Sequence, residues 1–185
     1  TTLSLSADAA RQAMAEAGVT PQDLDLIVVA TVSPQHILPS TACELQAELG
    51  CGWIPAYDVV AACSGFVYAL ITASQYIVTG MHKIVLVIGA ETLSRITDME
   101  DRGTAILFGD GAGAAVIRRS TDPNRSLLAT RLGADGKRSQ AIWIPGGGSA
   151  EPASQKTINE RLHYMRMNGR EVFRFAVTQM EELVQ

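Results

Sequence analysis

Charged residues are scarce in this sequence of 185 residues. They make up 18% of it, and 15 Lys and Arg against 19 Asp and Glu leave a formal net charge of −4. A surface that holds nucleic acid by overall charge is therefore not expected. With 47% apolar residues, the chain also lacks the low hydrophobicity of a disordered segment. Its length suffices for one well-buried domain and a little more.

Long apolar runs and targeting signals are missing as well. The longest nearly apolar stretch, residues 66–78, contains polar residues and is too short to span a bilayer. The first residues show no basic segment and no cleavage signal of a secretory leader. We therefore expect a cytoplasmic protein that does not insert into a membrane.

Cysteine is rare, and its spacing excludes two kinds of site. The sequence has no CxxC pair and no Cys/His spacing typical of zinc, so no metal is expected. An odd number of cysteines in a cytoplasmic protein argues against a disulfide framework. Each cysteine is then a small buried apolar residue or a reactive thiol. For two of the three, Cys43 and Cys51, we expect the buried residue.

The sequence does contain an alternation of helical patterns and apolar strand-like runs, which indicates an α/β fold. Helices are predicted at 7–17 (capped by Ser6, ended by Gly18), from Ser40 to about 49, at 65–79, and from 169 to 185. Strands are predicted at 26–30, 56–60, 83–89, 105–108, 114–118, 127–132 and 141–144. The helix at 65–79 is apolar nearly all round, which predicts a central, buried helix.

Two glycine-rich stretches are predicted as connections. Residues 109–113 lie between two predicted strands and do not open a helix, so they do not fit a dinucleotide-binding turn. We expect a tight turn there, with Asp110 bound to backbone amides. Residues 146–155 are predicted to form a mobile loop.

Cys63 is the strongest candidate for chemistry, because it stands where a predicted strand ends and the helix at 65–79 begins. Unpaired N–H groups and the helix dipole at such a place favour a thiolate, and a backbone N–H there can face an oxyanion. Its small neighbours let a substrate approach closely: Ala62, Ser64 and Gly65. A buried structural cysteine is the alternative, and these residues alone leave both open. No histidine stands where a base for Cys63 is expected, and each is predicted at the surface: His36, His82 and His163.

Five segments together resemble the N-terminal and middle portion of the β-ketoacyl-[acyl-carrier-protein] synthase III family, condensing enzymes of the thiolase superfamily. They are Ala61–Phe66, Asp101–Thr104, Phe108–Ala114, Leu132–Gly136 and Met167–Phe173. The resemblance implies an α/β, thiolase-like fold: an αβαβα layered half with a mixed sheet, plus the start of the second half. Residues 1–125 would form the N-terminal half with the nucleophile. Residues 126–185 would form connecting strands, a loop and the first helix toward the C-terminal half.

The resemblance also implies an activity. Cys63 would take an acyl group from acyl-CoA and condense it with malonyl-acyl carrier protein, with loss of CO₂, to initiate fatty-acid synthesis. The family is normally a homodimer and needs no cofactor beyond these substrates. The chain would begin after the family's first strand and end before its catalytic His and Asn, so these residues support acylation alone. The alternatives are another acyl-CoA condensing enzyme of the superfamily, which 101–104 and 167–171 argue against, and a non-catalytic half that binds a catalytic partner.

Residue roles follow from the same resemblance. Arg102 would meet the adenine and phosphate region of CoA, with a surface ion pair to Asp98, Glu100 or Asp101 as the alternative. Leu38 would lie on a loop that crosses the dimer interface and closes the neighbouring acyl pocket, or would simply pack under its own loop. The other matches would line the pantetheine and acyl channel, the pocket wall or the channel mouth: Leu107, Phe108, Leu93, Ile142, Met165, Met167, Gly169, Phe173 and Arg174.

Overall fold

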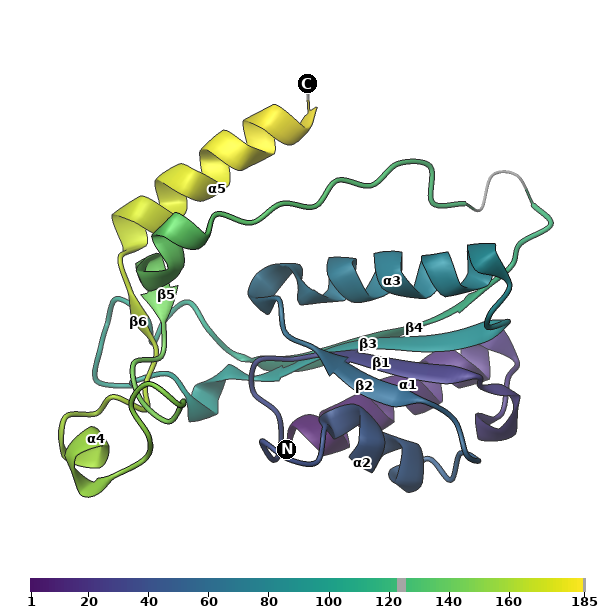
Figure 1. Cartoon of the computed structure of the whole chain (residues 1–185), viewed down its shortest axis with the longest axis horizontal. Coiled ribbons are helices and arrows are strands. Elements are labelled where there is room, and N and C mark those ends of the chain that lie inside the picture. The colour runs from purple at the N-terminus through teal and green to yellow at the C-terminus, as the bar shows by residue number, and fades with distance from the viewer. Residues whose placement is uncertain (123–125, 185) are drawn as a thin grey trace. The chain divides into compact units, whose positions relative to one another are not determined.

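A computed structural model describes residues 1–122 and 126–184 of the chain (Figure 1). These residues form two compact units. Unit 1 comprises Thr1–Thr92 and Asp110–Thr130, and unit 2 comprises Leu93–Gly109 and Arg131–Gln185. The division expected from the family resemblance, 1–125 and 126–185, concerns the halves of a larger fold and stays a prediction.

Unit 1 is built on a four-stranded mixed sheet with the order β2-β1-β3-β4. β1 (Leu26–Ala30) is parallel to β2 (Ala56–Val59) and to β3 (Ile84–Thr92), whereas β4 (Asp110–Arg118) is antiparallel to β3. Every residue of β1 is buried, as expected for a continuous apolar run in a strand covered on both faces. The predicted strands at 26–30, 56–60 and 83–89 are thus confirmed.

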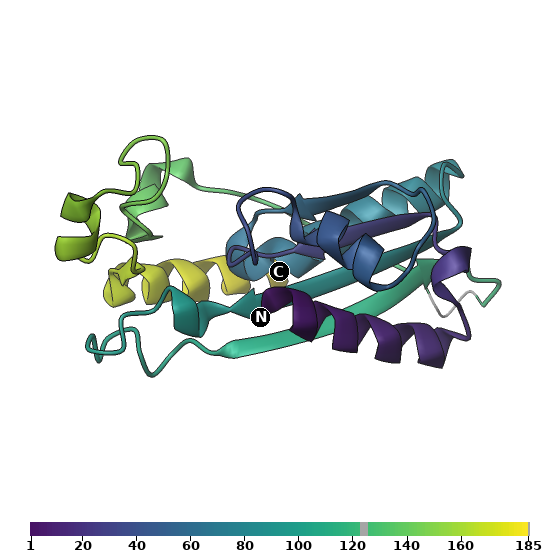
Figure 2. The same cartoon turned by 90° about the horizontal axis from the view of Figure 1, so that it is seen from below.

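Helices cover both faces of this sheet. α1 (Thr2–Ala17) and α2 (Thr41–Glu48) lie on one face and α3 (Gly65–Thr79) lies on the other (Figures 1 and 2). Alternate residues of β1 therefore enter different cores: Ile27 and Val29 pack with α1 and α2, and Val28 packs with α3. Burying each such side chain contributes about 1.5–3 kcal/mol, so the two apolar layers supply the main force that holds unit 1 together.

The ends of α1 show which predicted cap was right. The helix begins at Thr2, because the Thr1 hydroxyl accepts the Ser4 N–H at 3.2 Å and forms a capping box. The predicted cap, Ser6, is instead buried inside the helix, where it donates to the Thr2 carbonyl at 2.7 Å. Gly18 ends the helix with φ of 65°, a left-handed conformation that glycine adopts without steric cost. The Ser40 cap of α2 is also confirmed.

Only one face of α3 is buried, although its sequence predicts burial all round. The exposed side includes Val78, which is 69% exposed. By length and composition, Ala62–Thr79 is the one stretch of the described chain that could cross a membrane. However, α3 packs on the sheet as the core helix of an α/β unit does. Its buried residues form a narrow stripe: Gly65, Ala69, Ala73 and Ile77.

Residues 110–113 of the glycine-rich run are strand, and the prediction of a turn over 109–113 was wrong. Asp110 begins β4 and lies opposite Thr92 of β3, so it is not a turn residue. Of the apolar residues 105–108, predicted as a strand, the first three lie in a turn and Phe108 lies in the irregular backbone that follows it. Glycine weakens a strand locally, but nine consecutive residue pairs with β3 outweigh that preference here.

Unit 2 is less regular. β5 (Ile142–Trp143) pairs antiparallel with β6 (Arg166–Met167), and its helices are α4 (Gln155–Asn159) and α5 (Gly169–Val184). The predicted strand at 141–144 is therefore only two residues long, and the described residues 127–132 form no strand. α5 confirms the last predicted helix, whose final residue lies outside the described chain. Short 3₁₀ turns complete the described parts of the two units: Pro21–Asp23, Ala62–Ser64, Leu93–Arg95 and Gly136–Ala141.

Candidate active site

Cys63 lies at the edge of the sheet where the three parallel strands end. β2 ends at Val59, a 3₁₀ turn follows at Ala62–Ser64, and α3 begins at Gly65. In open α/β sheets, ligands bind outside the carboxyl ends of the parallel strands. Cys63 is exposed and its thiol is free. The alternative of a buried structural cysteine is therefore wrong, and the thiol is available to react.

The turn that carries Cys63 contains a strained residue. Ala62 has φ of 46°, a left-handed conformation that costs a non-glycine residue about 1–3 kcal/mol. The turn is closed by the Ser64 N–H, which donates to the Ala61 carbonyl at 3.2 Å. Residues held in such conformations cluster at active sites. No sequence signal predicts this feature, because alanine has no preference for positive φ.

The first turn of α3 is pressed against the sheet beside Cys63. A Cβ atom added to Gly65 would lie 3.1 Å from the Ala30 Cβ, and one added to Gly89 would lie 3.2 Å from the Phe66 ring. Glycine at both places thus allows the helix to start close to β1 and β3. The helix N-terminus favours negative charge. A thiolate or oxyanion formed at Cys63 would lie at this end of α3.

Neither of the two histidines in unit 1, His36 and His82, contacts Cys63 among the described residues of that unit. The His36 Nδ1 atom lies 2.8 Å from a Glu44 carboxylate oxygen. The rings of the other two pack on tyrosines, His82 on Tyr76 and His163 on Tyr164. For His36 and His82, the prediction that neither is placed as a base for Cys63 agrees with these contacts. For His163, which lies in unit 2, it stays a prediction.

The other two cysteines differ from each other. Cys43 is exposed on α2, so the expectation of a small buried residue was wrong there. Cys51 is partly buried, and burial raises the pKa of its thiol. At neutral pH, Cys51 is therefore less often a thiolate than an ordinary cysteine.

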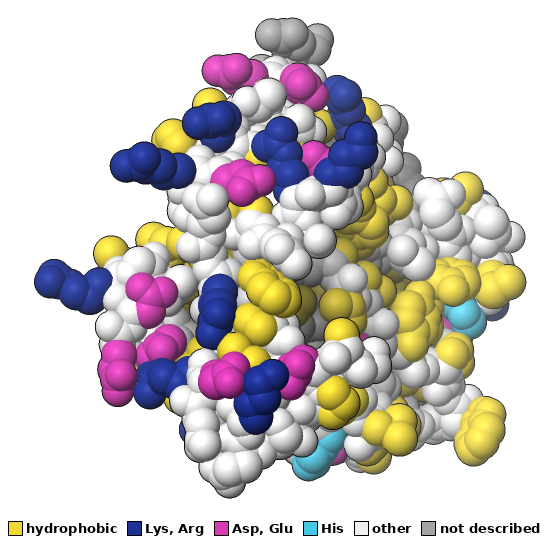
Figure 3. Space-filling view, turned by 60° about the vertical axis from the view of Figure 1, so that its left-hand side comes forward, with side chains coloured by type: hydrophobic (Ala, Val, Ile, Leu, Met, Phe, Trp, Pro, Cys, Tyr) yellow, Lys and Arg dark blue, Asp and Glu magenta, His cyan; other side chains and the backbone are white. Residues whose placement is uncertain are grey.

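Leu38 lies in the loop between β1 and α2. It is 87% exposed, and its neighbour Ile37 is 91% exposed. The alternative that Leu38 packs under its own loop is therefore wrong. Exposed apolar side chains are common on the face of the protein that Figure 3 shows. The exposed apolar residues of unit 1 also include Trp53 and Val60.

Arg102 in unit 2 is exposed in a turn and has no ion pair among the described residues. Two of the acids expected to pair with it have other partners. Asp98 accepts two bonds from Arg161, one from Nε at 3.0 Å, and Asp101 accepts the Gly103 N–H at 2.9 Å. The alternative of a surface ion pair is therefore wrong, and the Arg102 guanidinium is free to meet an anion.

Arg161 joins two segments of unit 2, a role that no motif in the sequence predicts. Its guanidinium binds Asp98 and lies 5.0 Å from the centre of the Tyr164 ring. The hydrogen bonds from Arg161 hold the pKa of Asp98 below its usual value. Nearby, the Met165 N–H donates to the Ile96 carbonyl at 2.7 Å. These contacts join residues 96–98, which precede Arg102, to residues 161–165.

Several residues assigned to the acyl channel come together in unit 2. Ile142 lies opposite Met167 across the β5–β6 pair, and Met165 is buried at 8% exposure. A Cβ atom added to Gly169 would lie 3.6 Å from the Met167 methyl group. Leu93 and Phe108 are half-buried, whereas the rest are exposed: Leu107, Phe173 and Arg174. Their roles stay predictions.

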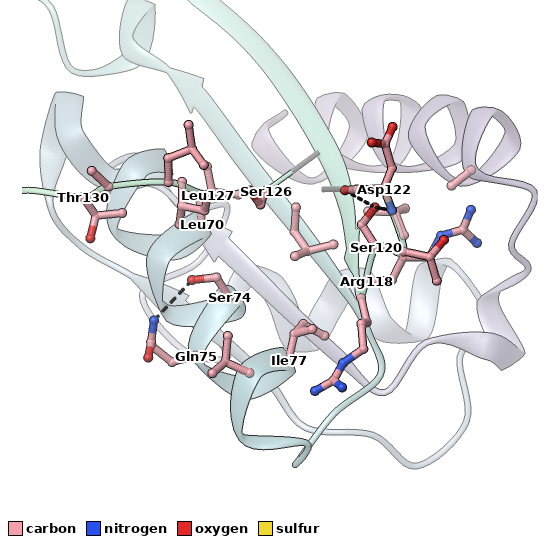
Figure 4. A pocket seen from close by; sticks show the side chains of 18 of the residues that line it. Leu70, Ser74, Gln75, Ile77, Arg118, Ser120, Asp122, Ser126, Leu127 and Thr130 are labelled. Carbon is pink, nitrogen blue, oxygen red and sulfur yellow. Dashed lines mark hydrogen bonds between the residues drawn. The ribbon is translucent and has the colours of Figure 1, made fainter. Parts of the chain in front are cut away.

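A hollow of about 1430 Å³ opens on unit 1 away from Cys63. It lies between α3 and the segment that follows β4, and Leu70, Ile77 and Leu127 line it (Figure 4). Its polar residues bond locally, as Ser74 does with Gln75. Cys63 is not among its lining residues, so this hollow is not the candidate active site.

Comparisons with known proteins identify the family. The family model of 3-oxoacyl-[acyl-carrier-protein (ACP)] synthase III matches residues 57–136. The β-ketoacyl-[acyl-carrier-protein] synthase III of Natranaerobius thermophilus is 50% identical over 94% of this chain and 53% of that protein. That of Caldanaerobacter subterraneus is 48% identical over 97% of this chain and 54% of that protein. The chain belongs to the β-ketoacyl-[acyl-carrier-protein] synthase III family.

Solved structures of synthase III enzymes show the same fold. The enzyme from Aquifex aeolicus superposes with a TM-score of 0.85 at 46% identity, covering 98% of this chain and 54% of that chain. The enzyme from Pseudomonas aeruginosa also superposes with a TM-score of 0.85, at 37% identity, covering 99% of this chain and 54% of that chain. The predicted α/β, thiolase-like fold is thus confirmed. The chain spans about half the length of the synthase III relatives that it matches.

Proposed function

We propose that the full-length protein is an acyltransferase that initiates fatty-acid synthesis. Cys63 accepts an acyl group from acyl-CoA, and this group is then condensed with malonyl-acyl carrier protein with loss of CO₂. The observation that carries the proposal is the exposed Cys63 thiol in a strained turn at the start of α3, in a chain of the synthase III family.

The chemistry has two stages. In the first, the Cys63 thiolate attacks the thioester carbonyl, and CoA leaves as a thiolate that takes up a proton. In the second, loss of CO₂ from the malonyl group leaves an enolate whose carbon attacks the acyl carbonyl. The Cys63–acyl bond breaks and the thiolate is restored. A thiolate suits both stages, because it is a good nucleophile and a good leaving group.

The residues of this chain supply part of what these stages need. The N-terminus of α3 stabilises the oxyanion that forms when Cys63 attacks the thioester, because the positive end of a helix favours negative charge. The enolate oxygen requires further donors, which the family resemblance assigns to a His and an Asn. Since neither His36 nor His82 contacts Cys63 among the described residues of unit 1, we assign acylation to Cys63 and the start of α3, and condensation to the full-length protein.

Substrate contacts are proposed for both units. The unpaired Arg102 binds the anionic end of CoA, because guanidinium and phosphate form strong charge-assisted hydrogen bonds. The residues grouped around Met167 contact the pantetheine and acyl chain. Leu38 contributes to an acyl pocket across a homodimer interface, which the exposure of Ile37 and Leu38 supports. The reaction takes place in the cytoplasm and requires no cofactor beyond the two substrates.

A coupled assay tests the proposal. Full-length protein is mixed with acetyl-CoA and malonyl-acyl carrier protein, and the carrier-bound product is measured by mass spectrometry. We expect a β-ketoacyl product that Cys63→Ser abolishes and Cys43→Ser leaves unchanged. If folded full-length protein forms no product, the proposal is wrong.

A further inference from the structure

Glu91 stands at the carboxyl end of β3 and reaches the loop that follows β1. Its carboxylate accepts the Val32 N–H at 2.9 Å. It also accepts the hydroxyl of Thr31 at 3.4 Å and the hydroxyl of Ser33. One side chain thus receives three hydrogen bonds from three consecutive residues of the loop.

The contacts of Glu91 continue into a larger polar group, which we call the Glu91 cluster: Thr2, Thr31, Ser33, Glu91 and Thr92. The Ser33 hydroxyl accepts the Thr92 N–H at 2.8 Å. The Thr2 hydroxyl donates to the Ser33 carbonyl and lies 2.8 Å from the Thr92 hydroxyl. All members except Glu91 are 9% exposed or less. The cluster therefore joins α1, the loop and β3 through buried hydrogen bonds.

Such a cluster holds its parts in one arrangement. Hydrogen bonds to a carboxylate are stronger than those between neutral groups. Removal of the carboxylate would leave buried hydroxyl and N–H donors without partners, which is costly. Stability alone does not require a buried polar network, because apolar packing of similar volume often serves as well. We therefore assign the cluster a role in fixing the position of the loop rather than in raising the stability of the core.

The loop is also held at its far end. Asp58 of β2 accepts the N–H groups of Thr41 and Ala42, both at 2.8 Å, at the start of α2. His36 binds Glu44 of the same helix. Residues 31–40 are therefore fixed at both ends, whereas Ile37 and Leu38 extend into solvent.

The same loop is bonded to the segment that carries Cys63. The Thr31 N–H donates to the Val59 carbonyl at 3.2 Å, and Val59 is the last residue of β2 before the Cys63 turn. Ala30, which precedes the loop, packs against Gly65 at the start of α3. The Glu91 cluster thus sets where the loop stands in relation to the Cys63 turn.

We propose that Glu91 is a positioning residue that holds loop 31–40, with Leu38 near its tip, where the loop closes the acyl pocket across the homodimer interface and limits which acyl chains that pocket accepts. The inference rests on the proposed function, since selection matters only if Cys63 is acylated. A loop released by loss of Glu91 would exclude unsuitable chains less sharply, because discrimination by size needs a rigid pocket wall.

The test compares three variants of the full-length protein. In Glu91→Ala, the ratio of kcat/KM for acetyl-CoA to that for octanoyl-CoA should move toward one by about tenfold. Glu91→Gln keeps a carbonyl oxygen for the Val32 N–H, so it should recover much of the wild-type ratio. Glu16→Ala, which removes an exposed carboxylate of α1, is the matched control and should leave the ratio unchanged.

Two further measurements separate positioning from folding and from the proposed function. Amide hydrogen exchange at Val32 should become faster in Glu91→Ala, while iodoacetamide should alkylate Cys63 at the wild-type rate. If the wild-type protein takes no acyl group, the proposed function fails, and hydrogen exchange still tests the anchoring. If Glu91→Ala does not fold, the test rests on Glu91→Gln, for which we expect a smaller shift of the ratio of kcat/KM for acetyl-CoA to that for octanoyl-CoA. Wild-type ratios in the folded variants would overturn the proposal.

Discussion

At the scale of single residues, backbone setting distinguishes Cys63 from Cys43, and exposure distinguishes Cys63 from Cys51. Cys43 is equally free of a disulfide and is exposed, so exposure alone does not make a thiol reactive. Cys63 differs because it follows the strained Ala62 and lies just before α3. The positive end of a helix favours a thiolate.

We expect Cys63 to be the most reactive of the three thiols. Limiting iodoacetamide at neutral pH should label Cys63 ahead of Cys43, and Cys51 should react last because burial raises its pKa. Peptide mapping of the labelled protein measures the order. Cys43 is the internal control for exposure, and preferential labelling of Cys43 would contradict the assignment.

Arg102 offers an unpaired guanidinium for an anionic ligand. Arg102→Ala should weaken CoA binding by roughly 1–3 kcal/mol, and more at low salt than at high salt. Isothermal titration calorimetry of the full-length protein at two salt concentrations measures both effects. Arg95→Ala, an exposed arginine of the same unit, is the matched control. Equal affinities for wild type and Arg102→Ala would reject the role.

Leu38 is predicted to affect the choice of acyl chain. A leucine is smaller than an aromatic ring and changes rotamer more easily. We therefore expect tolerance for starters a few carbons longer than acetyl, with Leu38→Phe shifting preference back toward acetyl. Each excluded methylene should change discrimination by about 1–3 kcal/mol. The measurement is kcat/KM for acetyl-, butyryl- and octanoyl-CoA, and an unchanged ratio would remove Leu38 from the pocket.

At the scale of secondary-structure elements, most buried strands and helix ends were predictable, whereas the cap of α1 and long-range pairing were not. β1 and α3 follow from an apolar run and from a helical pattern ended by glycine. The strand predicted at 114–118 is the second half of β4, and the first half was missed because its glycines resemble a turn until β3 pairs with them. Glu91 and its partner Val32 are 59 residues apart in the sequence, and Arg161 and its partner Asp98 are 63 residues apart. A single sequence contains no sign of which distant side chains meet.

The Arg161–Asp98 contact predicts how the stability of its junction depends on pH. Asp98 has a lowered pKa in the folded protein, so its contribution is fully present above the unfolded value of 3.8. It is lost as pH falls through the lowered folded value. Arg161→Met should therefore reduce Tm at pH 6, and this difference should shrink at pH values below 3.8. A difference in Tm that is the same at both pH values would show that the ion pair does not cause it.

At the scale of the whole molecule, the two compact units carry different parts of the proposed activity. Unit 1 carries the candidate nucleophile Cys63 and Leu38, and unit 2 carries the other candidate CoA and acyl contacts. The family and its fold were predictable from five short segments because their order and spacing are shared along nearly the entire chain. The conformation of Ala62 and the exposure of Leu38 became visible only in the structure.

Transfer of an acyl group to Cys63 is tested most directly by locating that group after the full-length protein is incubated with acetyl-CoA alone. Intact mass should rise by one acetyl group, and peptide mapping should place it on Cys63. The gain should be absent in Cys63→Ser and retained in Cys43→Ser. An acetyl group on Cys43 or Cys51, or no mass gain on folded protein, would contradict the assignment of Cys63 as the nucleophile.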